Sequence, residues 1–75
     1  MNIKILGSGC ANCARLEKNT KKAIAERGLE ASIEKVTDYK EIASFNILRT
    51  PGLVVDGKVV ASGKVLSVEE IKKLL

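Results

Sequence analysis

The apolar pattern of residues 1–36 constrains the fold of this chain more than any other feature. A short apolar run, Ile3 to Leu6, precedes a segment in which apolar or small residues recur every three or four positions as far as Gly28. The first pattern predicts a buried strand, and the second predicts a helix that starts at Cys10. Leu29 to Val36 then alternate between apolar and polar residues, which predicts a second strand. Two strands joined through a helix run parallel, so we expect a β–α–β unit.

Two further features concern the helices of the first half. The residues that define the inward face of the long helix are Cys13, Leu16, Thr20, Ala23 and Ile24. A second, shorter helix should begin after Asp38, because Asp38 and Glu41 have the spacing of a capping box. It should end near Phe45, since Asn46 tolerates the left-handed conformation that ends helices.

The second half of the chain predicts a hairpin and a final helix. Asp56-Gly57 separates two runs rich in β-branched residues, 53–55 and 59–61, which is a strong signal for a tight β-hairpin. Ser67-Val68-Glu69-Glu70 is a second capping-box pattern and should open the last helix. The residues expected to face inward from that helix are Val68, Ile71, Leu74 and Leu75.

These patterns together predict an α/β fold with the order strand, helix, strand, helix, strand, strand, helix. The sheet should be mixed and four-stranded, with three helices, in a single domain spanning residues 1–75. With one Phe, one Tyr and no Trp, the core must consist of Ile, Val, Leu and Ala. No apolar run approaches the ~20 residues of a membrane span. The first residues lack the features of a signal peptide, so we expect a cytoplasmic location, where thiols stay reduced.

Both cysteines of the chain, Cys10 and Cys13, lie in one Cys-x-x-Cys motif after the first predicted strand. Two thiols at this spacing suit either disulfide exchange or a metal ion, and a pair of inert core cysteines is the third interpretation. With two Cys and no His, one chain cannot supply the four ligands that zinc prefers. A soft ion such as Cu(I) remains the alternative to redox chemistry.

The predicted order of strands and helices distinguishes disulfide exchange from metal binding. Heavy-metal-associated domains carry a loop similar to Gly9-Cys10-Ala11-Asn12-Cys13, but they end on a strand. This chain is expected to end on a capped helix and to place another helix between its second and third strands. It also has Ser8 where those domains often have Met. We therefore favour the redox interpretation.

The chain resembles the minimal thioredoxin/glutaredoxin-like redox-active disulfide proteins of prokaryotes over nearly its whole length. The resemblance rests on the Cys-x-x-Cys motif and on residues 45–55, which are similar to the thioredoxin segment that carries the cis-proline. It implies a thioredoxin-like fold and a thiol–disulfide oxidoreductase that reduces protein disulfides in cell redox homeostasis. It also implies that Pro51 is cis and lies against the disulfide, with Thr50 offering backbone hydrogen bonds to a substrate. The supporting site residues would be Gly9, Ala11, Asn12, Thr50, Pro51 and Gly52.

The expected roles of the two cysteines differ. Cys10 would be the nucleophile, because a thiolate at the first turn of a helix is stabilised by the helix dipole. Cys13 would be the resolving thiol, and burial one turn further in disfavours its thiolate. We expect Gly7 and Gly9 to keep side chains away from Cys10. The basic residues expected to add positive potential near the motif are Lys4, Arg15 and Lys18.

The expected partners are disulfide-containing proteins and an unidentified reductase or thiol donor, with no cofactor or metal. The formal net charge of +4 includes a basic cluster, Arg15, Lys18, Lys21 and Lys22, which is also compatible with nucleic-acid binding. Glu17 and Glu26 interrupt it, and few aromatic residues are present for base stacking, so a solvated helix face is favoured. We expect a monomer that binds neither nucleic acid nor membrane. A non-catalytic binding module on the same fold is a further alternative.

Overall fold

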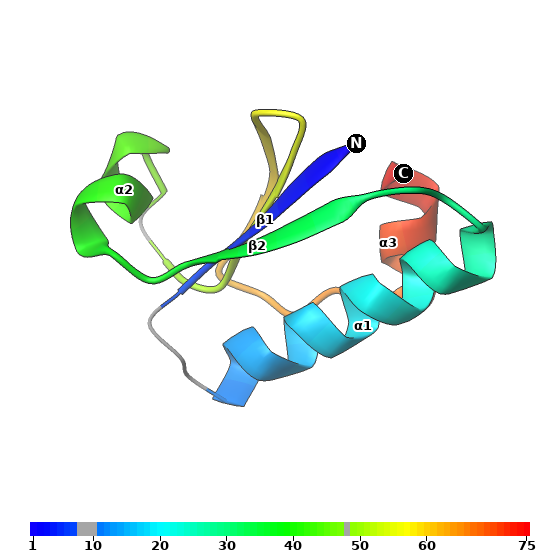
Figure 1. Cartoon of the computed structure of the whole chain (residues 1–75). Helices are drawn as coiled ribbons and strands as arrows, with labels where there is room; N and C mark the ends of the chain where they lie inside the picture. The colour runs from blue at the N-terminus through cyan, green and yellow to red at the C-terminus, as the bar shows by residue number, and fades with distance from the viewer. Residues whose placement is uncertain (8–10, 48) are drawn as a thin grey trace.

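The computed structural model describes residues 1–7, 11–47 and 49–75. Its elements follow the predicted order (Figure 1). They are β1 (Asn2–Leu6), α1 (Ala11–Arg27), β2 (Ser32–Val36), α2 (Tyr39–Ser44), β3 (Gly52–Val55), β4 (Lys58–Ser62) and α3 (Val68–Leu74). The predicted α/β class, with a four-stranded mixed sheet and three helices, is confirmed.

The strands form one sheet in the order β2-β1-β3-β4. β1 pairs with β2 in parallel, as the β–α–β pattern predicts, and with β3 in antiparallel fashion. β3 and β4 form the predicted hairpin, whose turn residues Asp56 and Gly57 have φ angles of 49° and 84°. These positive φ angles match the tight turns that Asp-Gly favours. The arrangement places β1 and β3 in the middle of the sheet, with β2 and β4 at its edges.

Two apolar clusters lie on opposite faces of the sheet. In Figure 1, α1 and α3 lie together, away from α2. The larger cluster lies between the sheet and the helices α1 and α3, and its buried residues are Ile3, Ile5, Leu16, Ala23, Leu53, Ala61, Leu66 and Ile71. The smaller cluster lies on the α2 side, and its buried residues are Leu6, Val36, Ile42 and Val54. Alternating residues of β1 thus enter different clusters, because successive side chains of a strand point to opposite faces.

The helix α1 buries the face that its sequence predicts. Cys13, Leu16, Thr20 and Ala23 are its buried residues, while Ile24 is half-buried. The buried Thr20 hydroxyl donates to the carbonyl of Leu16 at 2.7 Å, so this polar group has a partner. The backbone amide of Leu29 donates to the carbonyl of Ile24 at 3.1 Å, across Gly28 with its φ angle of 64°. This is the bond pattern of a helix that ends through a left-handed glycine.

The prediction that the second strand starts at Leu29 was wrong, because β2 begins at Ser32. Gly28 and Leu29 still complete the end of α1, since both amides donate to carbonyls of its last turns. The chain therefore pairs with β1 only from Ser32 onward.

The cap of α2 is simpler than predicted. Asp38 accepts a hydrogen bond from the backbone amide of Lys40 at 2.9 Å. The return bond from Glu41 that would complete a capping box is not among the contacts of the described residues. The helix ends where expected, and Asn46 has a φ angle of 58°.

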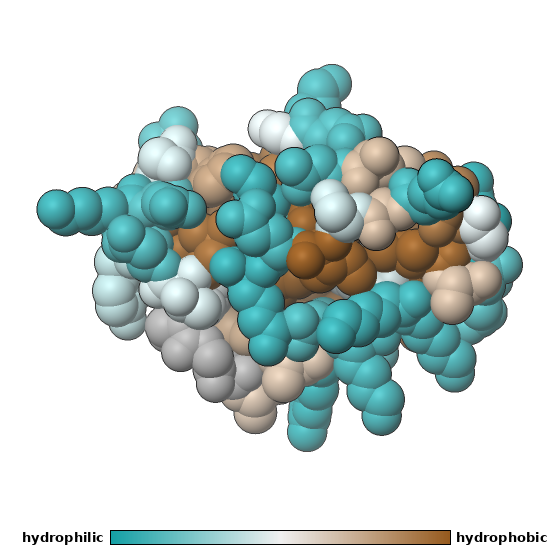
Figure 2. All heavy atoms as spheres, in the orientation of Figure 1, coloured by the Kyte–Doolittle hydropathy of each residue, from teal (hydrophilic) through white to brown (hydrophobic). Residues whose placement is uncertain are grey.

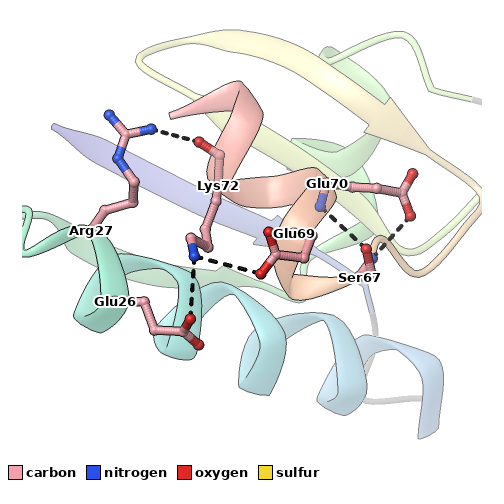
Figure 3. Close-up of polar contacts among 6 residues, drawn as sticks. All are labelled: Glu26, Arg27, Ser67, Glu69, Glu70 and Lys72. Carbon is pink, nitrogen blue, oxygen red and sulfur yellow. Dashed lines mark hydrogen bonds and ion pairs between the residues drawn. The ribbon is translucent and has the colours of Figure 1, made fainter.

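The cap of α3 is the predicted box. The Ser67 hydroxyl accepts from the Glu70 amide, and the Glu70 carboxylate accepts from the Ser67 amide, both at 3.2 Å (Figure 3). Ile71 faces the core as expected, but Leu74 is 43% exposed, so its predicted inward position was wrong. Val68 and Ile71 of α3, and Leu75 directly after it, pack in the larger cluster. Leu74 lies instead beside a surface groove with Val60 and Leu66.

Polar contacts hold α3 against the end of α1 (Figure 3). The Lys72 ammonium pairs with Glu26 at 3.2 Å and with Glu69 at 3.5 Å. The Arg27 guanidinium donates to the Lys72 carbonyl at 2.7 Å. The hydrogen bond to Glu26, and then the charge of Glu69, raise the pKa of Lys72 above its ordinary value.

The surface carries hydrophilic side chains over most of the outline seen in Figure 2, with apolar side chains in a band across the middle of this face. Within the described residues, no helix has the length and apolar character needed to cross a membrane.

Candidate active site

The candidate site is formed where β1 ends, where α1 begins and where the chain enters β3. Ser8, Gly9 and Cys10 lie outside the described residues, so the predictions made for Gly9 and Cys10 are not tested here. Cys13 lies in the first turn of α1, is only 6% exposed, and its sulfur is engaged in a disulfide. Ala11 and Asn12, which precede it in the same turn, are exposed. The turn thus presents two small side chains to solvent and directs the sulfur of Cys13 inward.

Gly7 makes room for Cys13. A Cβ atom at position 7 would clash with the Cys13 sulfur and would lie 3.3 Å from the Cys13 Cβ. The same Cβ would lie 3.8 Å from the Cβ of Thr50. Gly7 is anchored by its amide, which donates to the carbonyl of Val36 at 2.9 Å. Gly7 therefore forms the floor between Cys13 and Thr50, a role that the sequence does not show because Thr50 is far from the other two residues along the chain.

The Thr50–Pro51 peptide bond is cis, which agrees with the geometry that the family resemblance implies. Pro51 is fully buried, whereas Thr50 is exposed beside Gly7. Gly52 begins β3 and pairs with Leu6 on one side and Ser62 on the other. A Cβ atom at Gly52 would approach the Ile47 Cδ1 to 2.9 Å, so the neighbouring side chains fill the space there.

Gly63 supports this loop and is a residue that sequence reasoning missed. Its amide donates to the carbonyl of Pro51 at 2.8 Å. Its φ angle is 75°, a conformation that favours glycine, and a Cβ atom there would lie 2.9 Å from the Cβ of Arg49. The sequence marks Gly63 only as the end of a strand, since its partners come from a different part of the chain.

The electrostatics of the site come mainly from α1. The first turn of the described helix, Ala11–Arg27, holds no acidic residue that would offset the positive end of the helix dipole. Lys4 does not contribute as expected, because its ammonium lies over the Phe45 ring, 5.6 Å from the ring centroid, on the α2 side of the sheet. This position suits a cation–π contact rather than a role beside the cysteines.

The basic cluster on α1 is an exposed helix face, as the sequence favours. Glu17 lies within it and pairs with Lys21 at 3.8 Å and with Lys35 of β2 at 3.1 Å. Among the described residues, no group of three or more His, Cys, Asp or Glu side chains is placed to hold a metal ion together.

Comparison with known proteins identifies the family. Residues 1–75 match the family described as "Thioredoxin domain". The chain is 47% identical over 75 residues to a "Thioredoxin" from Methanothermobacter thermautotrophicus, covering 100% of this chain and 97% of the relative. It is 48% identical over 73 residues to a "Thioredoxin" from Methanocaldococcus jannaschii, covering 97% of this chain and 84% of that relative.

These similarities do not favour the alternative function, binding of a soft metal ion such as Cu(I). The final helix α3 also argues against it, because heavy-metal-associated domains end on a strand. They agree with the predicted thioredoxin-like fold and with a thiol–disulfide oxidoreductase. The chain belongs to the thioredoxin family, as a small archaeal-type member that acts as a thiol–disulfide oxidoreductase.

Proposed function

We propose that this oxidoreductase reduces protein disulfides, with Cys10 as the nucleophile and Cys13 as the resolving thiol. The observation that supports this most directly is the placement of Cys13. Its sulfur is buried, engaged in a disulfide and positioned over Gly7, next to the exposed Thr50. A buried thiol suits the second, intramolecular step, in which no bulky substrate has to reach it.

The reaction consists of two exchanges. The Cys10 thiolate attacks one sulfur of the substrate disulfide, forming a mixed disulfide and expelling the first substrate thiolate. The Cys13 thiolate then attacks the Cys10 sulfur, forming the Cys10–Cys13 disulfide and releasing the second substrate thiolate. Two electrons pass from the protein dithiol to the substrate, and the released thiolates take up protons from solvent. A dithiol donor must return two electrons to the protein before the next turnover.

The remaining motif residues have supporting roles in this proposal. Gly9, Ala11 and Asn12 leave the approach to Cys10 unobstructed by large side chains, and Ala11 and Asn12 are exposed. Thr50 would hydrogen-bond through its backbone to an extended substrate segment, with Pro51 and Gly52 holding it in place. The buried Pro51 and the bond from Gly63 to its carbonyl support such a role, because they fix the loop that carries Thr50.

We further propose that residues 1–75 act as one domain and as a monomer in the cytoplasm. The name of the two relatives supports protein disulfides as substrates and a reductase or thiol donor as the electron source. A reducing compartment would keep the pair in the dithiol state that this reaction consumes.

Reduction of insulin disulfides in the presence of dithiothreitol tests the proposal. The wild-type protein should accelerate precipitation of the insulin B chain, whereas Cys10→Ser and Cys13→Ser should each lower the steady-state rate to that of dithiothreitol alone. Lys22→Met is a suitable control, because Lys22 is exposed on the side of α1 away from the core. Wild-type protein without any acceleration would contradict the proposal and favour a non-catalytic binding module. Cysteine variants as active as the wild type would contradict the assignment of the pair.

A further inference from the structure

A surface groove adjoins the candidate site on the α2 side of the sheet. Its volume is about 250 Å³, and its lining residues are Tyr39, Ile42, Ala43, Ile47, Arg49 and Thr50. Thr50 belongs both to this groove and to the site around Gly7. A polypeptide whose disulfide reaches the site is therefore expected to extend into the groove. The groove is continuous with the surface on which the proposed reaction takes place.

The groove has an apolar floor and an aromatic rim. Ile42 is buried at its base, and Ile47 is half-buried against the smaller cluster. Tyr39 is 75% exposed, which is a large exposed fraction for an aromatic side chain. Burial of such a side chain by a partner is favourable, and aromatic residues are enriched in protein interfaces for this reason. The floor and rim fit an apolar side chain of a bound segment.

Arg49 places a cation at the end of this groove nearest Thr50. Its aliphatic stem packs on Gly63, since a Cβ atom there would lie 2.9 Å from the Arg49 Cβ and 3.3 Å from its Cδ. Arg49 is nevertheless exposed, and no ion pair joins it to a carboxylate in the described part of the chain. The stem is held in place, while the guanidinium pairs with no carboxylate of the residues that the structure describes.

We propose that Arg49 and this groove select protein disulfides in which the reactive cysteine is flanked by an acidic residue and an apolar residue. The inference rests on the proposed function and deepens it by naming a substrate class. The carboxylate of the substrate pairs with the Arg49 guanidinium, whose planar fork can donate two parallel hydrogen bonds. The apolar residue fills the groove between Tyr39 and Ile47. An exposed pair of this kind favours the acidic substrate by about two- to fivefold.

Competition between designed peptides tests this selectivity. Three peptides carry one intramolecular disulfide and one leucine and differ only in the residue beside the reactive cysteine, which is Glu, Gln or Lys. The second-order rate constant for oxidation of the reduced protein is measured with each peptide at low salt. For the wild type we expect the Glu peptide to react about threefold faster than the Gln peptide, with the ratio approaching one in 0.5 M salt. The ratio is the readout, because it does not depend on the overall activity of a variant.

Two variants of Arg49 separate charge from packing. Arg49→Met keeps an aliphatic stem against Gly63 and removes the charge, so the Glu/Gln ratio should fall to about one. Arg49→Glu should prefer the Lys peptide over the Gln peptide. Lys22→Met makes the same change in net charge away from the groove and should keep the wild-type ratio. Equal rates for the three peptides in the wild type, or an unchanged ratio in Arg49→Met, would overturn the inference.

Failure of this inference is distinguishable from failure of the proposed function. The wild-type protein is also tested with 2-hydroxyethyl disulfide, which carries no charge. If the protein reduces this compound but shows no selectivity among the peptides, the inference about Arg49 is contradicted and the proposed function is not. Reduction of neither the compound nor any peptide would contradict the proposed function and, with it, the substrate class.

Discussion

The two faces of the sheet differ in how they are held. On one face, α1 and α3 close the larger cluster, and Lys72, Glu26 and Arg27 join the two helices at their ends. On the other face, a single helix of 6 residues covers the smaller cluster with one buried side chain, Ile42. The elements of the proposed site are divided between these faces, since Cys13 lies on α1 and the groove beside Thr50 lies along α2.

This difference suggests a division of roles. The α1/α3 face buries most of the apolar side chains and should account for most of the stability, whereas the α2 face contributes less and borders the surface where substrates are expected to bind. Binding surfaces are commonly drawn from the less stable parts of a protein, because they must adapt to partners. The following predictions test this division, from the largest expected effect to the smallest.

The same substitution on the two faces should have unequal costs. Ile71→Ala removes a fully buried side chain from the larger cluster and should lower the free energy of unfolding by about 4 kcal/mol. Ile42→Ala acts on the smaller cluster, where the neighbours can relax more easily, and should cost about 2 kcal/mol. Urea unfolding of both variants measures the difference. Equal costs, or a larger cost for Ile42→Ala, would show that the two faces do not differ in this way.

Gly7 lies against Cys13, and its substitution should affect the chemistry more than the stability. In Gly7→Ala the added methyl group would clash with the Cys13 sulfur, so the buried sulfur must move. Misplacement of a reacting group on this scale should lower the rate of insulin reduction by roughly tenfold or more. Gly57→Ala is the control. It introduces strain at a φ angle of 84° with no neighbour within 4 Å, and should lower stability without lowering the rate of the folded protein. Full activity in Gly7→Ala would contradict the role of Gly7.

The helix caps provide a smaller comparison between the faces. Ser67→Ala removes the hydroxyl that accepts a hydrogen bond from the Glu70 amide, and with it the reciprocal capping box of α3. It should lower the free energy of unfolding by about 1 kcal/mol. Asp38→Ala removes a single bond from the shorter α2 and should cost about 0.5 kcal/mol. Thermal unfolding followed by circular dichroism should rank the two variants in this order, and the reverse order would count against the proposed division.

The smallest effect concerns the pH dependence of the α3 cap. Hydrogen bonds from the backbone and hydroxyl of Ser67 lower the pKa of Glu70 below its ordinary value of 4.5. A carboxyl whose pKa is lower in the folded state than in the unfolded state stabilises the fold at pH values above the unfolded-state pKa. This stabilisation is lost as the pH falls through the folded-state pKa. Wild type should therefore be slightly more stable than Glu70→Gln at pH 7, and the difference should close on the acid side of 4.5. A difference that grows on acidification would contradict the cause assigned to this shift.

The sequence predicts the parts of the fold that have local causes. The Asp56-Gly57 turn, the capping box of Ser67 and the end of α1 at Gly28 depend on residues a few positions apart, and all three are confirmed. Leu29 was misassigned because its alternation with Glu30 and Ala31 resembles a strand, whereas its amide completes the end of α1.

Contacts between distant segments could not be predicted in the same way. Lys4 was expected near the cysteines, but the pleat of β1 directs it to the Phe45 ring on the other face. The approach of Gly7 to the Cys13 sulfur, and that of Gly63 to Arg49, depend on how the segments come together in the fold. A glycine in a sequence does not indicate which neighbour occupies the space that its missing side chain leaves.

The most direct test of the central claim is to trap the mixed disulfide. Reduced Cys13→Ser is mixed with an oxidised protein substrate, and the adduct is detected by mass spectrometry under non-reducing conditions. The account predicts a stable adduct through Cys10 in Cys13→Ser, because the first exchange proceeds and the second cannot, and little adduct in Cys10→Ser. An adduct that forms mainly through Cys13, or equally in both variants, would contradict the assignment of Cys10 as the nucleophile and Cys13 as the resolving thiol.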